Sequence, residues 1–126
     1  MNKRIVGARN FEDILAIVEA EHGVFNAVNV ATACSRLAKA TQSSANSADL
    51  NDLRVQALFR TVTRAGPSMN AQALANTIWG LATLGWQPGE GAMRGALEAA
   101  AVRVAPSMNA QDVANTVWAH GKFKRR

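Results

Sequence analysis

The chain has 126 residues, of which 48% are hydrophobic and 18% charged, and its formal net charge is +5. This length suffices for one domain with a buried core, and the composition excludes an intrinsically disordered chain. No apolar run approaches the roughly 18 residues of a membrane span. The single cysteine, Cys34, excludes an internal disulfide and a cysteine-based zinc cluster within this sequence.

The first predicted element is a helix near residues 10–21, from about Phe11 to Ala20. Residues 1–9, MNKRIVGAR, contain three basic groups and no acid, but they run directly into the acidic segment FEDILAIVEAE. An amphipathic transit peptide is poor in acids. We therefore predict no targeting segment here.

Helical patterning continues along the rest of the chain. Further helices are expected within 25–40, from about Leu50 to Arg64, after Asn70, from about Glu90 to Val104, and after Asn109. The polar stretch 41–49, TQSSANSAD, is expected to be a loop. No segment of useful length alternates like a strand, so the fold class is all-α, with roughly six helices.

An internal repeat organises these helices. PSMNAQALANTIW at 67–79 and PSMNAQDVANTVW at 106–118 agree at ten of thirteen positions, and Met69 recurs one repeat later as Met108. A divergent copy, FNAVNVATACSRLAKA, occupies 25–40, with five extra residues assigned to the loop at 41–49. The intervening segments also correspond, because Leu58, Arg64 and Pro67 recur at the same spacing as Leu97, Arg103 and Pro106.

The repeat period is about 39 residues, which is typical of helical-repeat arrays. We therefore predict an α-solenoid of stacked helical hairpins, with units near 25–66, 67–105 and 106–126 after the leading helix. Because the last unit ends after its first helix, we expect the 126 residues to be part of a longer array.

Local signals place the helix ends. Asn70 and Asn109 are expected N-caps, whose side chains accept from free amides of the first turn. Asp112, three residues after Asn109, puts an acid beside those amides. Gly85 is the expected stop of the helix that begins after Asn70.

On a helical wheel, the segment 71–84 has one broad apolar arc that should face the core, made of Leu74, Ala75, Ile78, Leu81 and Ala82. The opposite arc defines three equivalent rows, one per unit. The first row is Val28, Thr32, Arg36 and Lys39; the second row is Gln72, Asn76, Gly80 and Thr83; the third row is Gln111, Asn115, Ala119 and Lys122.

Stacked units would align these rows into columns of amides and cations without an acid. Such a surface suits phosphates and base edges. In this interpretation Arg36, Lys39 and Lys122 contact phosphates, while Asn76 and Asn115 contact bases. The alternative is structural: the two asparagines would instead link neighbouring units through backbone hydrogen bonds.

Two further features have two interpretations each. Trp79 and Trp118 lie at the edge of the apolar arc, where they either pack between repeats or provide stacking surfaces for bases. The last five residues, KFKRR, hold four of the five net charges and leave the other 121 residues at +1. Lys124, Arg125 and Arg126 therefore form either an electrostatic arm for a polyanion or a solvated end.

Catalytic patterns are lacking in this sequence. His22 and His120 are isolated, the acids are scattered over helix faces, and no nucleophile–base pairing or metal-ligand spacing is visible. The glycines do not form a phosphate-binding loop. We predict that this chain is not an enzyme and binds no cofactor or metal.

The segments MNAQDVANTVWAHGKF and MNAQALANTIWGLATLGWQP resemble octotricopeptide-type repeats, in the style of the arrays of RAP-domain and FAST-kinase-like proteins. The upstream segment FEDILAIVEAEHGVFNAVNVATACSRLAKA is similar to the start of such arrays. The arrays also resemble the armadillo-like subunit of the kinetoplastid RNA-editing substrate-binding complex. The resemblance covers roughly residues 4–123. In two respects the sequence departs from the pattern: Ser35 stands in place of the tryptophan in the first unit, and these 126 residues contain no RAP domain.

The resemblance implies an organellar RNA-binding protein, in a mitochondrion or plastid, that supports processing, stability or translation of transcripts. The expected partners are single-stranded RNA and other RNA-processing proteins, with no membrane and no small-molecule substrate. The alternative function is an armadillo-like scaffold for protein–protein interactions, because solenoids also present extended surfaces to proteins. The low charge outside the tail favours the scaffold, and the absence of acids from the columns favours RNA.

Overall fold

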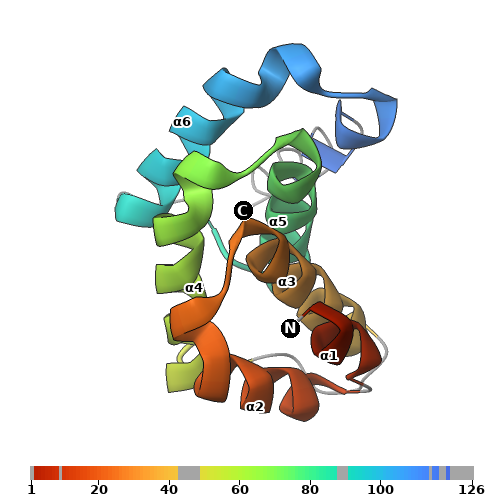
Figure 1. Cartoon of the computed structure of the whole chain (residues 1–126), viewed down its shortest axis with the longest axis vertical. Coiled ribbons are helices and arrows are strands. Elements are labelled where there is room, and N and C mark those ends of the chain that lie inside the picture. Colours follow the sequence, from red (N-terminus) through yellow and green to blue (C-terminus); the bar gives the residue numbers. More distant parts are fainter. Residues whose placement is uncertain are drawn as a thin grey trace.

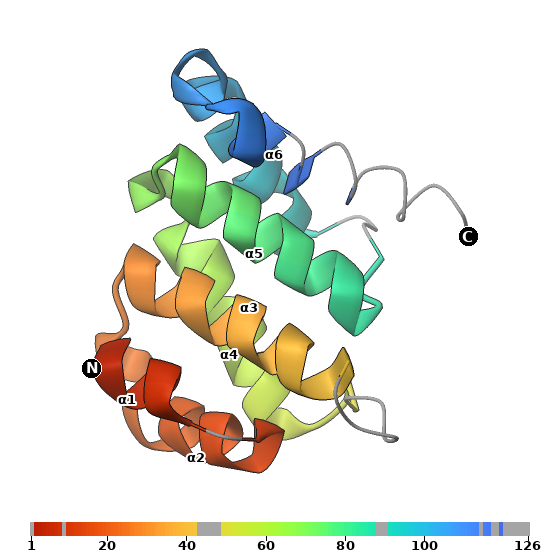
Figure 2. The same cartoon turned by 90° about the vertical axis from the view of Figure 1, so that its right-hand side faces the viewer.

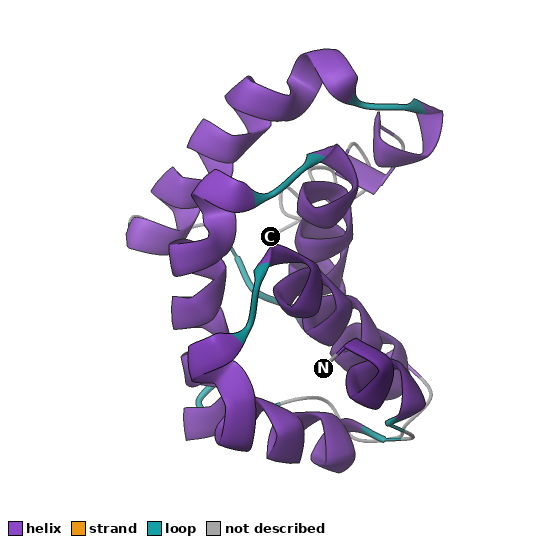
Figure 3. Cartoon of the chain, in the orientation of Figure 1, coloured by secondary structure: helices purple, strands orange, loops and turns teal. Residues whose placement is uncertain are grey.

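The structure is a computed structural model and describes residues 2–8, 10–42, 49–87, 91–113, 115–116 and 119. These residues form helices joined by short turns and loops, with no strand among them (Figure 3). The elements are α1 (Asn2–Gly7), α2 (Phe11–Glu21), η1 (His22–Val24), α3 (Ala27–Gln42), α4 (Leu53–Ala65), η2 (Gly66–Ser68), α5 (Ala71–Leu84), α6 (Ala92–Val104) and η3 (Ala105–Ser107). The all-α prediction is confirmed.

The helices form two layers. In one, which we call the inner layer, α1, α3 and α5 stack one above the next (Figure 2). In the other, the outer layer, α2 packs on α4 and α4 packs on α6 (Figure 1). Contacts of α2 with α3, α3 with α4, and α5 with α6 join the layers. The short helix α1, which the sequence did not predict, is the first member of the inner layer.

The predicted caps are confirmed. Asn70 Oδ1 accepts from the amide of Ala73 at 2.8 Å, and α5 ends at Gly85, which has φ 94°. The chain leaves the helix there through a left-handed backbone conformation, which glycine adopts without a steric cost. Asn109 and Asp112 exchange two hydrogen bonds, because Asn109 Oδ1 accepts from the Asp112 amide at 2.8 Å and Asp112 Oδ2 from the Asn109 amide at 3.2 Å. A capping box of this kind satisfies two free amides together.

Contact between α3 and α5 is close because small residues line it. A Cβ on Gly80 would lie 2.7 Å from the backbone carbonyl of Cys34, so only glycine fits at this position. Side chains from both layers fill the core; the largest that are fully buried include Leu37, Leu58, Val62, Met69, Leu74 and Leu81. In the predicted apolar arc of α5, Leu74, Ala75, Leu81 and Ala82 are buried, and Ile78 is half-buried against the core.

Two arginines bind the turns between the layers. Arg64 Nη2, in the last turn of α4, donates to the carbonyls of His22 at 3.2 Å and Phe25 at 2.8 Å. Arg103 Nη2, in the last turn of α6, donates to the carbonyls of Gly66 at 3.0 Å and Met69 at 2.8 Å. The correspondence of Arg64 and Arg103 in the sequence repeat is therefore matched by the same contact in the structure. We call Arg64 and Arg103 the turn-binding arginines.

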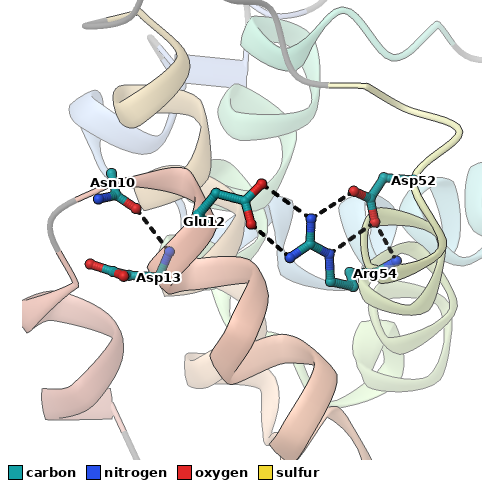
Figure 4. A network of polar contacts seen from close by, with 5 residues as sticks. All are labelled: Asn10, Glu12, Asp13, Asp52 and Arg54. Atoms are coloured by element: carbon teal, nitrogen blue, oxygen red, sulfur yellow. Dashed lines mark hydrogen bonds and ion pairs between the residues drawn. The ribbon is translucent and has the colours of Figure 1, made fainter.

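A third arginine joins the starts of two outer-layer helices (Figure 4). Arg54 pairs with Glu12 of α2 at 2.9 Å and with Asp52, the N-cap of α4, at 2.9 Å. Hydrogen bonds from Arg54 lower the pKa of Glu12 and of Asp52 below their usual values. Opposite charges held this close favour the ionised forms of all three groups.

Candidate nucleic-acid interface

The inner layer has an uneven charge distribution. Its helices α1, α3 and α5 contain Lys3, Arg4, Arg36 and Lys39 but no aspartate or glutamate. In the outer layer, α2 alone contains four acids and no basic residue. Arg4 forms an ion pair with Glu21 at 3.2 Å, which places it at the boundary with the outer layer. Helix α4 of the outer layer also lacks acids, but two of its three arginines have partners, because Arg54 pairs with Glu12 and Asp52 and Arg64 binds backbone carbonyls. The inner layer is therefore one side on which cations and amides can meet a polyanion without an acid on the same helices.

The first row follows the accessible side of α3. Val28 is 51% exposed and Lys39 is exposed, while Thr32 and Arg36 are half-buried. The Thr32 hydroxyl donates to the Val28 carbonyl at 2.8 Å, so this hydrogen bond lies within α3 and does not link α3 to a neighbouring unit. Arg36 and Lys39 are thus two cations about one turn apart on the same helix face.

The second row is accessible only in part. Gln72 is exposed and Asn76 is half-buried, but Gly80 is buried in the contact between α3 and α5. The assignment of Gly80 to the open polar arc is therefore wrong, because α5 is covered on more than one side. The Thr83 hydroxyl is buried without a hydrogen-bond partner, and it offers nothing to a ligand in this conformation.

The third row begins with a pair of amides. Gln111 Nε2 donates to Asn115 Oδ1 at 3.1 Å along one helix face. Ala119 is buried, as its counterpart Gly80 is, so this position again faces the interior. Lys122, Lys124, Arg125 and Arg126 lie outside the described residues.

Among the described residues, the side-chain hydrogen bonds that join an outer-layer helix to the preceding turn come from Arg64 and Arg103 and not from the two asparagines. Asn115 accepts from Gln111 within its own helix. Sequence reasoning identified the spacing of these arginines but not their role. The acceptors are backbone carbonyls, which no side-chain pattern reveals.

Trp79 is half-buried and packs against the core, and Trp118 lies outside the described residues. A second aromatic side chain, Trp86, lines a pocket of about 410 Å³ between α4 and α6. Arg60 and Arg94 also line this pocket, and Arg94 pairs with Glu98 at 2.8 Å. Sequence reasoning missed the pocket, because its residues come from three separated segments.

The features that bear on catalysis or metal binding are few. Among the described residues, no group of three histidine, cysteine or acidic side chains could hold a metal ion. Cys34 is buried, and desolvation raises the pKa of its thiol to about 12, so the thiol stays protonated at neutral pH. His22 lies in the η1 turn and His120 outside the described residues.

Comparison of the chain with protein-family models, curated proteins and solved structures yields no match. In the part of the chain that the structure describes, no helix combines the length and the apolar character needed to cross a bilayer.

Proposed function

We propose that this chain is an RNA-binding helical-repeat module, an α-solenoid of repeated hairpins that binds single-stranded RNA along its inner layer. The main support is the charge of that layer, because α1, α3 and α5 contain four basic residues and no acid. The equivalent contacts of Arg64 and Arg103, at matching positions of successive repeats, support the solenoid part of the proposal.

In this proposal, Arg36 and Lys39 contact phosphates, and Lys122, Lys124, Arg125 and Arg126 extend the same path. Phosphate contacts supply affinity that does not depend on sequence, whereas amides can donate to and accept from a base edge. Gln72, Asn76 and Asn115 are the amides available for that second role. The resemblance to octotricopeptide-type and RAP-domain proteins supports a function in processing, stability or translation of mitochondrial or plastid transcripts.

The test is binding of the chain to a single-stranded RNA oligonucleotide, followed by fluorescence anisotropy across a salt series. Arg36→Ala/Lys39→Ala should weaken binding and reduce the slope of log K against log salt by about 0.7 per lost contact. Arg60→Ala, which removes an exposed cation from the outer layer, is the matched control and should leave the slope unchanged. Asn76→Ala should change sequence preference but not salt dependence.

The second candidate function is a protein–protein scaffold. It is favoured by two exposed apolar side chains near the start of α3, Val24 at 70% and Val28 at 51%, and by the charge of only +1 outside the last five residues. Deletion of residues 122–126 distinguishes the candidates. If that deletion abolishes RNA binding while Arg36→Ala/Lys39→Ala binds normally, the inner layer is not the site and the scaffold becomes the better account.

A further inference from the structure

The two interfaces of the outer layer differ where its helices begin. The three 3₁₀ turns begin at residues 22, 66 and 105, so equivalent positions are 44 residues apart in the first spacing and 39 in the second. At the interface of α2 with α4, Arg54 pairs with Glu12 at 2.9 Å and with Asp52 at 2.9 Å. This first interface therefore contains two carboxylates for one guanidinium.

The residues of this ion-pair network have neutral equivalents one repeat later. In the order Glu12, Asp52 and Arg54, the equivalents are Gln56, Gly91 and Met93. The helix caps support this alignment, because Asp52 caps α4 and Gly91 is the N-cap residue of α6, where it makes no side-chain hydrogen bond. All three equivalents line the pocket of about 410 Å³ between α4 and α6. The pocket thus lies where the preceding repeat has its ion-pair network.

Two arginines of this pocket stand at positions that are uncharged in the preceding repeat. Arg60 is equivalent to Ala16, and Arg94 is equivalent to Val55. Both arginines are exposed, and none of the described residues that line the pocket is acidic. Compared with the first interface, the described lining has exchanged two carboxylates for a second guanidinium. Its charge is therefore suited to an anionic ligand.

The rest of the lining combines apolar side chains with amides. Phe59 is buried, while Trp86 and Met93 are half-buried. Aromatic rings and the flexible thioether of methionine adapt well to an apolar side chain of a ligand. Gln87 also lines the pocket, and a side-chain amide can both donate to and accept from a peptide backbone. The volume lies within the range of about 300–1,000 Å³ that is typical of ligand sites.

We propose that this pocket binds an acidic peptide segment of a partner protein, in which an apolar side chain lies between carboxylates. Arg60 and Arg94 pair with the carboxylates, and the apolar side chain contacts Trp86. A carboxylate is the favoured anion because Glu12 binds Arg54 through both of its oxygens, at 2.9 and 3.2 Å, at the equivalent place of the preceding repeat. A peptide also supplies the backbone groups that a side-chain amide can pair with, and arginine clusters commonly recognise acidic motifs. This inference is independent of RNA binding, which involves the inner layer.

The test is an NMR titration of the ¹⁵N-labelled full chain with a peptide, blocked at both ends, in which one leucine lies between two pairs of glutamates. The amides of Gln56, Trp86 and Met93 should shift. A second peptide, in which glutamine replaces all four glutamates, should bind about tenfold more weakly, because arginine clusters recognise the charge of acidic motifs. Equal binding of the two peptides, or shifts confined to other surfaces, would overturn the proposal.

Variants of the chain test the two arginines. Arg60→Gln/Arg94→Gln should weaken binding of the acidic peptide about fivefold, as expected for two exposed ion pairs. Glu98→Gln should strengthen binding, because it removes the carboxylate that pairs with Arg94 at 2.8 Å. All three positions are exposed, so circular dichroism should show unchanged helix content. If the double variant binds as tightly as the unmodified chain, the assigned contacts are wrong.

Three controls distinguish other occupants and other surfaces. Arg36→Gln/Lys39→Gln removes two cations from the inner layer and should leave the affinity for the peptide within twofold; a loss of binding would mean that the peptide follows general charge. Uridine monophosphate should not shift the pocket amides, and shifts at lower concentrations than those of the peptide would identify a nucleotide site instead. Glu90→Gln removes the acid that precedes Gly91 and should leave the affinity within twofold. A tenfold gain would identify the chain's own carboxylate as the occupant, which contradicts a partner.

Discussion

Replacement of Arg103 by methionine should destabilise the protein, because it removes the two hydrogen bonds from α6 to the preceding turn. Arg103 Nη2 lies 3.0 Å from the Gly66 carbonyl and 2.8 Å from the Met69 carbonyl. A hydrogen bond to a charged group contributes about 1.5–3 kcal/mol. Because Arg103 is partly hydrated and Gly66 keeps its bond from the Met69 amide, we expect the pair to contribute about 2 kcal/mol in total.

Unfolding entropy of about 2.1 cal/mol/K per residue converts this loss to a fall in Tm of about 8 °C for a chain of this length. Calorimetry or thermal circular dichroism measures it directly. Methionine keeps most of the aliphatic stem, so the comparison isolates the guanidinium. Arg64→Met should give a similar fall because its contact has the same geometry, whereas Arg60→Met should change the free energy of unfolding by less than about 0.5 kcal/mol. If Arg103→Met is no more destabilising than Arg60→Met, the role assigned to the turn-binding arginines is refuted.

Three other predictions concern packing and charge. Gly80→Ala should destabilise the protein by about 1–3 kcal/mol, because its Cβ would lie 2.7 Å from the Cys34 backbone. Gly95→Ala, where a Cβ would meet nothing within 4 Å, should stabilise α6 by up to about 1 kcal/mol. Denaturant titration measures both changes in the free energy of unfolding, and changes of the same sign would contradict the close contact of α3 and α5. The buried thiol of Cys34, with its pKa raised to about 12, should react with a thiol reagent only as fast as the protein unfolds; rapid labelling of the folded protein would show that the site is open. A hydrogen bond from Arg54 lowers the folded-state pKa of Glu12, so this contribution to stability is complete above the unfolded value of about 4.3 and is lost as the pH falls through the folded value. Arg54→Met should therefore make the unfolding midpoint less sensitive to acid, and an unchanged acid profile would contradict the ion pair.

Local signals in the sequence were sufficient for most of the helix positions. The caps at Asn70 and Asn109 and the stop at Gly85 depend on hydrogen bonds between residues close in the chain, so the residue types alone predict them. Helix α1 was missed because it is six residues long, too short to show a helical period. Its position is fixed by packing against α3, a contact that sequence patterns do not reveal.

The sequence predicted the candidate interface only at positions whose exposure depends on the face of a single helix. The exposure of Lys39 and Gln72 follows from the helical wheel, but the burial of Gly80 does not, because α5 contacts neighbours on more than one side. The roles of Arg64 and Arg103 were hidden for a different reason. Their acceptors are backbone carbonyls of a turn, and only the folded chain brings these within reach.

The measurement that tests the central claim most directly is an NMR titration of the ¹⁵N-labelled chain with a single-stranded RNA oligonucleotide. If RNA binds along the inner layer, the amide shifts should concentrate on α3 and α5, at Thr32, Arg36, Lys39, Gln72 and Asn76. Phosphate contacts should make these shifts decrease as salt rises. Shifts confined to the pocket between α4 and α6, or no shifts on α3 and α5 at saturating RNA, would contradict the claim.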